Sequence, residues 1–186
     1  MSPRMPAFDT FPTEANIIGR LLAGYGELEF ALCQCIAQAR DDFDTTVKAL
    51  FRTRGERQRV KVADALGRSI FRSLGYGDMF SEAVADMLFC TKLRNRYAHC
   101  NWHDDLSGKI GFVDLEEIAE GHAKARISNL TIHHLDEQVL AAQMNYFDYV
   151  DKCLVFLNFE AQKLGGRLDS HPWQIPKKIG RPIERL

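Results

Sequence analysis

Long stretches of the chain repeat apolar residues at the spacing of an α-helix. Between Thr13 and Arg40 they recur every three or four positions, at Ile18, Leu21, Leu22, Tyr25, Leu28, Leu32 and Ile36. This spacing gathers the apolar side chains on one face of a helix. The same periodicity predicts further helices over residues 45–53, 56–74, 78–99 and 133–164. Aspartates at 41, 42 and 44 and glycines at 55, 75 and 77 separate the early ones.

The last of these helices carries apolar residues on more than one side. Such a helix lies in the centre of a bundle or buries one side against a second copy of the chain. The helical period is absent between residues 101 and 129, where Ser107-Gly108 is a turn signal. Residues 109–113 and 125–128 favour β-structure, which predicts a small hairpin or an irregular insert.

The chain of 186 residues is long enough for one domain with a sizeable core. We expect a flexible lead over residues 1–12, which contains Pro3, Pro6 and Pro12, and a helical domain over residues 13–164. A basic tail over residues 165–186 is expected to be extended or partly disordered. The predicted fold class is all-α: a bundle of about five helices, with the insert before the last helix.

Composition narrows the classes of function. The net charge is -1, so any binding of nucleic acid must come from a local cluster of cations. The five cysteines are an odd number without the spacing of a disulfide framework, which favours reduced thiols and the cytoplasm. The N-terminus lacks the apolar region of a signal peptide, and charges interrupt the apolar run over residues 17–39. We therefore expect no membrane-spanning segment.

The residues Arg94-Asn95-Arg96-Tyr97-Ala98-His99, here called the 94–99 motif, hold the candidate chemistry. The predicted helical face is apolar at Phe80, Val84 and Met87 and becomes polar at Arg94 and Asn95. A face of this kind reaches solvent or lines a pocket. An arginine suits a phosphate, and a histidine suits a proton transfer.

The 94–99 motif, late in a long helix of a predicted bundle, resembles the signature of the HEPN superfamily (higher eukaryote and prokaryote nucleotide-binding domains). That signature is an Arg, an adjacent polar residue and a His after a short gap. Many HEPN proteins are dimeric, metal-independent endoribonucleases, often toxins or antiviral effectors. The resemblance implies that Arg94 binds the scissile phosphate, that His99 is a general acid or base, and that Asn95 orients one of them. The implied products are a 2′,3′-cyclic phosphate and a 5′-hydroxyl.

These roles are chemically reasonable. Arginine can bind a phosphate through two parallel hydrogen bonds, and histidine can give and take a proton near neutral pH. Acid–base cleavage benefits from two imidazoles, and a twofold axis beside His99 would supply the second. One HEPN subgroup has a tyrosine two residues after the His, as the target of a partner nucleotidyltransferase. Asn101 stands there in this chain, so that regulation is not supported.

Five further residues are candidate RNA contacts: Arg54, Arg57, Lys92, Arg96 and Trp102. Arg54 and Arg57 lie in a run of five cations over residues 52–61, for which a solvated surface is the alternative. Arg96 is alternatively the partner of an acid, and Trp102 alternatively packs against the bundle. His99 and His103 have metal-ligand spacing on a continuous helix, but Asn101-Trp102 indicates that the helix has ended. We expect no metal and no cofactor, and we expect His133 and His134 at the start of the last helix.

For a chain whose composition favours the cytoplasm, the resemblance implies a homodimer that cleaves single-stranded RNA at a composite site holding Arg94, Asn95 and His99. The resemblance adds a toxin or phage-defence setting, with an antitoxin as a further partner. Some HEPN proteins lack nuclease activity, and cations are common near helix C-termini, where they complement the helix dipole. The alternative is a non-catalytic dimerisation module that binds a nucleotide or a partner.

Overall fold

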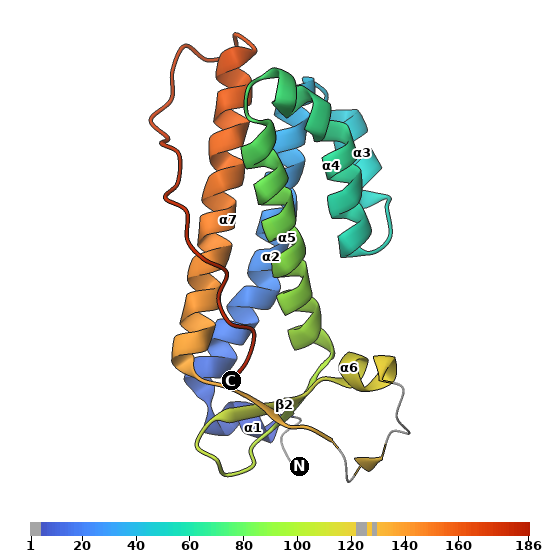
Figure 1. Cartoon of the computed structure of the whole chain (residues 1–186), viewed down its shortest axis with the longest axis vertical. Coiled ribbons are helices and arrows are strands. Elements are labelled where there is room, and N and C mark those ends of the chain that lie inside the picture. Colours follow the sequence, from blue (N-terminus) through green and yellow to red (C-terminus); the bar gives the residue numbers. More distant parts are fainter. Residues whose placement is uncertain (1–4, 122–125, 128–129) are drawn as a thin grey trace. The chain divides into compact units, whose positions relative to one another are not determined.

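The computed structural model describes residues 5–121, 126–127 and 130–186. It is mostly helical and contains a small antiparallel sheet (Figure 1). The chain divides into two compact units. The first, the motif unit, comprises Met1–Ala23, Lys92–Tyr146 and Gly180–Leu186. The second, the α3–α4 unit, comprises Gly24–Thr91 and Phe147–Ile179.

The five predicted helices correspond to α2 (Pro12–Arg40), α3 (Phe43–Phe51), α4 (Glu56–Ser73), α5 (Gly77–His99) and α7 (Glu137–Leu164). Their boundaries follow local chemistry where the sequence offers it. The Asp42 carboxylate accepts a hydrogen bond from the Thr45 backbone N–H at 3.0 Å and caps α3. None of the helices in the described ranges has the length and apolar character needed to cross a bilayer.

The strands in and next to the insert form a three-stranded sheet, where the sequence predicted a hairpin or an irregular segment. Strands β1 (Asn101–His103), β2 (Ile110–Val113) and β3 (His133–Leu135) pair antiparallel in that order, and the short helix α6 (Leu115–Glu120) follows β2. Four residues of the predicted β-prone segment 109–113, namely 110–113, thus form a strand. Most of the second β-prone segment, residues 125–128, lies outside the described residues.

The start of the last helix was predicted too early. His133 and His134 belong to β3, and α7 begins at Glu137. The physical cause is a cap and a strand pairing. The Asp136 carboxylate accepts a hydrogen bond from the Val139 N–H at 3.0 Å, while Leu135 pairs with Ile110 and both side chains are fully buried. A buried cross-strand pair outweighs the weak helical signal of the two histidines.

The N-terminal lead contains a helix that the sequence did not predict, α1 (Pro6–Thr10). Ala7 is fully buried, and the ring of Phe8 lies 5.4 Å from that of Trp102. Proline at the first position of a helix loses no hydrogen bond, which explains why Pro6 is compatible with the turn.

The α3–α4 unit has an aromatic core around Gly67 of α4. Phe71 and Phe80 stack with ring centroids 4.6 Å apart. Tyr25 and Thr91 share a buried hydrogen bond of 2.8 Å. A Cβ atom at Gly67 would lie only 2.7 Å from Phe80 Cζ and would also collide with the Ile36 side chain. Gly67 therefore lets α4 approach its neighbours closely.

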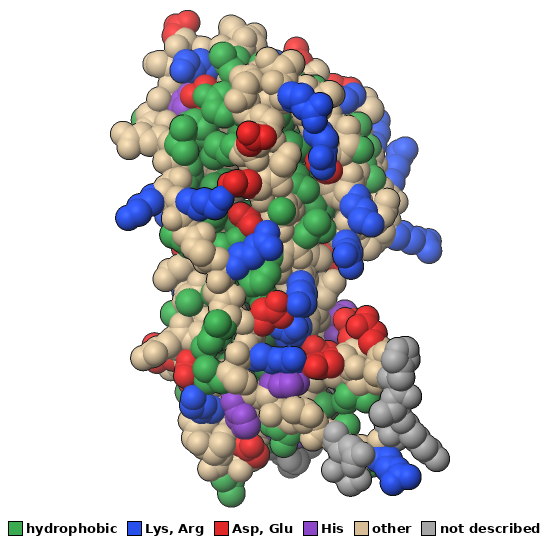
Figure 2. Space-filling model, in the orientation of Figure 1, with side chains coloured by type: hydrophobic (Ala, Val, Ile, Leu, Met, Phe, Trp, Pro, Cys, Tyr) green, Lys and Arg blue, Asp and Glu red, His purple; other side chains and the backbone are tan. Residues whose placement is uncertain are grey.

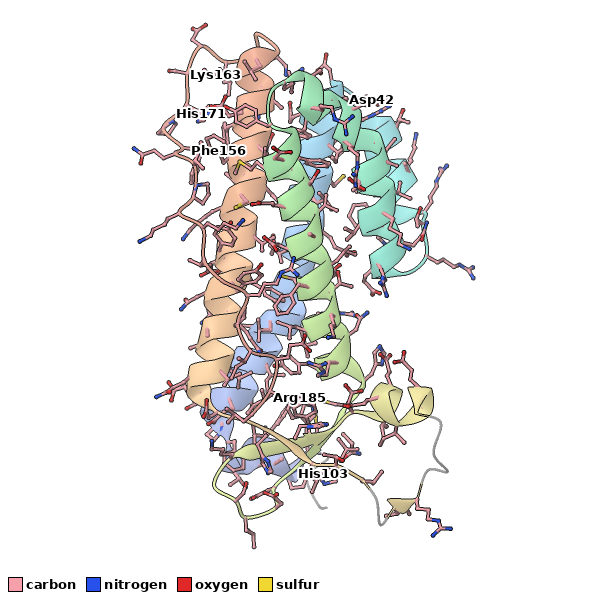
Figure 3. The ribbon with its side chains drawn as sticks, viewed as in Figure 1. Asp42, His103, Phe156, Lys163, His171 and Arg185 are labelled. Atoms are coloured by element: carbon pink, nitrogen blue, oxygen red, sulfur yellow. The ribbon has the colours of Figure 1, made fainter. Side chains whose placement is uncertain are left out.

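The first part of the basic tail, up to Ile179, runs along the α3–α4 unit without helix or strand. His171 pairs with Glu160 at 2.9 Å and its ring lies 5.9 Å from that of Phe156 (Figure 3). Trp173 stacks on Phe159, and Lys178 pairs with Glu82 at 2.8 Å. Side-chain contacts thus hold this part of the tail within the unit.

Replacing Gly67 by alanine tests the close approach in the core. Alanine favours a helix by about 1 kcal/mol over glycine, but here its methyl group has no room, so we expect a net loss of about 1–3 kcal/mol in unfolding free energy. Gly26→Ala is the matched control, because Gly26 is an exposed helical glycine with open space around its Cβ position. Urea unfolding should show destabilisation for Gly67→Ala alone, and equal stability of the two variants would contradict the packing.

Candidate functional site

The 94–99 motif forms the last turn and a half of α5, in the motif unit. Arg94 and Asn95 are half-buried, and His99 is exposed. The Arg94 Nη1 group donates a hydrogen bond to Asn95 Oδ1 at 3.0 Å. The helix ends at His99 and strand β1 begins at Asn101, as the pair Asn101-Trp102 indicated.

Asn95 is hydrogen-bonded to Arg94 and lies on nearly the same helical face as His99. Successive residues of an α-helix are rotated by about 100°, so Asn95 and His99 lie one turn apart on nearly the same face. Arg94 points about 140° away from His99 by the same count. Its hydrogen bond to Asn95 turns the guanidinium towards the shared face. A guanidinium, an amide and an imidazole thereby lie at one end of α5.

Arg96 has a different role. Its side chain is only 9% exposed, and its Nε group donates to the Asp114 carboxylate at 3.1 Å. Its Nη1 group lies 2.7 Å from Glu184 Oε2. This contact is an ion pair whose angles do not meet those of a hydrogen bond. This confirms the alternative in which Arg96 is the partner of an acid. Asp114 also accepts hydrogen bonds from the backbone of Glu116 and Glu117, so Arg96 holds the N-terminus of α6.

Lys92 shares the acid of Arg96. It lies one turn earlier on the same face of α5, and its Nζ is 2.8 Å from Glu184 Oε1. Burial acts to raise the pKa of Glu184, but the contacts with Lys92 and Arg96 outweigh it. The pKa of Glu184 therefore lies below its usual value near 4.5.

Glu184 belongs to the C-terminal segment, residues 180–186, which docks onto the motif unit. The fully buried Gln143 of α7 donates from Nε2 to the carbonyl oxygen of Ile183 at 3.0 Å. Its Oε1 accepts a hydrogen bond from the Tyr97 hydroxyl. The Leu186 N–H donates to the His134 carbonyl at 3.0 Å, beside β3 (Figure 1). Tyr97 of the motif thus orients the Gln143 amide, which in turn binds the C-terminal segment.

Arg185 anchors the same segment to α6 and β3. Its guanidinium pairs with both oxygens of Glu117, at 2.5 and 3.1 Å, and contacts the ring of His133 at 2.9 Å (Figure 3). Figure 2 shows the resulting mixture of acidic, basic and His side chains in the part of the molecule that holds the sheet. The contact with Arg185 lowers the pKa of Glu117.

Trp102 packs within the protein, as its alternative predicted. Its ring lies within 6 Å of the rings of Phe8, Tyr97 and Phe112, at 5.4, 5.7 and 5.7 Å. The register places Trp102, Phe112 and His133 on one face of the sheet and His103 on the other. His99 and His103 are therefore not on one continuous helix. The described ranges hold no cluster of three or more His, Cys, Asp or Glu suited to a metal ion.

Arg54 and Arg57 belong to the α3–α4 unit, at the connection between α3 and α4 and in the first turn of α4. Both are exposed, and Figure 2 shows cationic side chains gathered over α4. Arg59, from the same run, is structural. It pairs with both oxygens of Glu29, at 2.8 and 2.9 Å, and lies 5.7 Å from the Phe51 ring centroid. The run therefore combines one structural arginine with an exposed basic surface.

Sequence reasoning missed the partners of Arg96 and Tyr97, namely Asp114, Glu184 and Gln143, and the partner of Arg185, Glu117. Gln143 left one signal, because it stands among Val139, Ala142 and Tyr146 on an otherwise apolar helical face. A polar residue in such a position needs a buried partner. The acids left no such signal, since their partners are distant in sequence.

Comparison of the chain with protein-family models, with curated proteins and with solved structures gives no match.

Removing the Arg96 charge tests its structural role. In Arg96→Met, Asp114 and Glu184 lose their shared cation, and we expect a loss of about 2 kcal/mol or more in unfolding free energy. Lys92→Met is the matched control, because Lys92 is 58% exposed and its ion pair should contribute less than about 1 kcal/mol. Urea unfolding of both variants measures the difference. Similar losses would mean that Arg96 is not the buried centre of the network.

The lowered pKa of Glu184 predicts how its contribution depends on pH. A carboxylate with a pKa below its unfolded value stabilises the fold above that unfolded value, and the stabilisation is lost as pH falls through the folded pKa. The difference in unfolding free energy between wild type and Glu184→Gln should therefore be full at neutral pH. It should shrink as pH falls below about 4.5. Denaturant titrations over this range measure it, and a difference independent of pH would contradict the ion pairs.

Proposed function

We propose that this protein is a HEPN-like, homodimeric endoribonuclease of the cytoplasm that cleaves single-stranded RNA without a metal ion. One observation carries the proposal. The hydrogen bond from Arg94 to Asn95 turns a guanidinium towards the face of α5 on which the exposed His99 lies. A cation for the phosphate and an imidazole for the proton are thereby brought to one end of a helix.

The proposed reaction uses the RNA itself as the nucleophile. The His99 imidazole takes the proton from a ribose 2′-hydroxyl, the 2′-oxygen bonds to the adjacent phosphorus, and the bond from phosphorus to the 5′-oxygen breaks. Arg94 stabilises the charge on the non-bridging oxygens, and Asn95 holds Arg94 in place. The products are a 2′,3′-cyclic phosphate and a 5′-hydroxyl.

The leaving 5′-oxygen needs a proton, and one imidazole that has just accepted a proton is poorly placed to deliver another on the opposite side of the phosphorus. In the proposal, His99 of the partner subunit donates it. A twofold axis near the C-terminal end of α5 brings the two imidazoles together and makes the site composite. The exposure of His99 supports this arrangement, because the described part of the insert does not bury it.

The proposal assigns RNA backbone contacts to exposed cations. Lys92 lies near the motif, and Arg54 and Arg57 offer a second basic surface. Trp102 supports the site by packing behind Tyr97. A toxin or phage-defence setting and an antitoxin partner are part of the proposal through the resemblance to HEPN proteins alone.

Cleavage of labelled single-stranded RNA in EDTA tests the function. Wild type should yield cyclic-phosphate ends, and Arg94→Ala and His99→Ala should each lower the rate at least about a hundredfold, since each removes transition-state stabilisation or proton transfer. His103→Ala is the matched control and should retain the wild-type rate. Excess His99→Ala protein mixed with wild type should lower activity further than dilution does, because mixed dimers lack one imidazole.

Two outcomes would contradict the nuclease. Activity that survives both substitutions would place the chemistry elsewhere. An inert, folded wild-type dimer that binds RNA or nucleotides through Arg94 and His99 would favour the non-catalytic binding module.

A further inference from the structure

The C-terminal segment places a carboxylate on two cations of the motif helix. We propose that Lys92 and Arg96 form a phosphate-binding subsite for RNA, and that Glu184 occupies it, so that residues 180–186 restrict RNA access until they are displaced. This inference rests on the proposed function, because it takes RNA as the ligand. It adds to that function a subsite and a means of regulation.

The Glu184 carboxylate lies within ion-pair distance of two cations at once. One carboxylate oxygen lies 2.8 Å from Lys92 Nζ, and the other lies 2.7 Å from Arg96 Nη1. The two non-bridging oxygens of a phosphodiester can take the same positions, since charged donors of this kind bind carboxylates and phosphates alike. Glu184 therefore marks where a phosphate can bind.

The proposed subsite lies beside the candidate catalytic residue His99 on α5. Lys92, Arg96 and His99 follow one another at helical spacings of four and three, so they share a face of α5. Arg96 and His99 are separated by about 5 Å along the helix axis. A strand of RNA bound at His99 can thus present a neighbouring phosphate to Lys92 and Arg96.

The charges balance only while an anion is present. Lys92 and Arg96 contribute two positive charges, and Asp114 and Glu184 contribute two negative ones. Without Glu184 the group carries one net positive charge around a nearly buried guanidinium, which is costly unless another anion replaces it. Asp114 keeps the Arg96 Nε group engaged throughout, so the guanidinium stays oriented for an incoming phosphate.

The C-terminal segment is held in a way that permits release. It contains no helix or strand, and its apolar side chains Ile183 and Leu186 are 58% and 49% exposed. Polar contacts help to hold it: the ion pairs of Glu184, the amide of Gln143, the backbone of His134 and the pairing of Arg185 with Glu117. Because Ile183 and Leu186 remain about half exposed, detachment costs only part of the hydrophobic stabilisation that full burial of these side chains would give.

Binding of a non-cleavable RNA tests the subsite apart from catalysis. The probe is a fluorescein-labelled oligouridylate with 2′-O-methyl groups, titrated with full-length protein at about 0.1 M salt. Glu184→Gln frees the two cations and should tighten binding about tenfold. Glu82→Gln is the matched control, because it makes the same charge change at another acid paired with a lysine at 2.8 Å. It should change the affinity less than about twofold.

The Arg185→Gln variant distinguishes two effects on RNA affinity: release of the C-terminal segment and a change in the net charge of the protein. It removes a positive charge, which by itself weakens RNA binding, but it also removes the anchor to Glu117. Tighter binding, by about threefold, is expected if the segment restricts access. Adding Lys92→Gln to Glu184→Gln should abolish the gain.

An affinity of folded Glu184→Gln equal to that of Glu82→Gln would overturn the proposal, and so would weaker binding by Arg185→Gln. If Glu184→Gln does not fold, the Arg185→Gln result decides alone. Tighter binding by these variants without cleavage by any of them would retain the subsite and reject the nuclease. Cleavage by wild type without tighter binding by the variants would retain the nuclease and reject the subsite.

Discussion

The nearly buried guanidinium of Arg96 determines the arrangement of the motif unit. A charge that is only 9% exposed is stable only if acids surround it, and both of its acids come from other elements. Asp114 begins α6, and Glu184 lies near the end of the chain. Glu117 of α6 in turn binds Arg185, next to Glu184. One side chain of α5 therefore links the insert and the C-terminal segment in a closed ring of charges.

The 94–99 motif divides its residues between two tasks. Arg96 and Tyr97 face the protein, where Arg96 meets two acids and Tyr97 donates to the buried Gln143. Arg94, Asn95 and His99 form the candidate chemical group, and His99 is exposed. Because a helix turns by about 100° per residue, Tyr97 can be buried while His99 is exposed, and Arg96 lies between these two directions. Burial of Arg96 and Tyr97 also fixes the helical end on which the other three lie.

Periodicity in the sequence was sufficient to predict the five longer helices and failed for the shorter elements. Helices such as α2 and α7 repeat their apolar pattern over many turns, whereas β1 and β3 have three residues each and α1 has five. Elements of that length depend on tertiary pairing, as Leu135 does on Ile110. The motif could be found because its residues are adjacent. The partner of Lys92 and Arg96 could not, because Glu184 is about 90 residues away and nothing local distinguishes it.

The positive and negative charges near the C-terminal end of α5 cancel, and this affects how the protein could bind a polyanion such as RNA. The whole chain has a net charge of -1, so attraction over long distances is weak and recognition depends on local cations. Two of those cations, Lys92 and Arg96, are already balanced by Glu184 and Asp114. In the proposed exchange of the Glu184 carboxylate for a phosphate, the guanidinium of Arg96 would be paired before and after, which would avoid the large cost of an isolated buried charge. Selectivity for RNA over the Glu184 carboxylate would then come from groups that Glu184 does not contact. Asn95 and the exposed His99 are two such groups, and they lie beside Arg96 on α5.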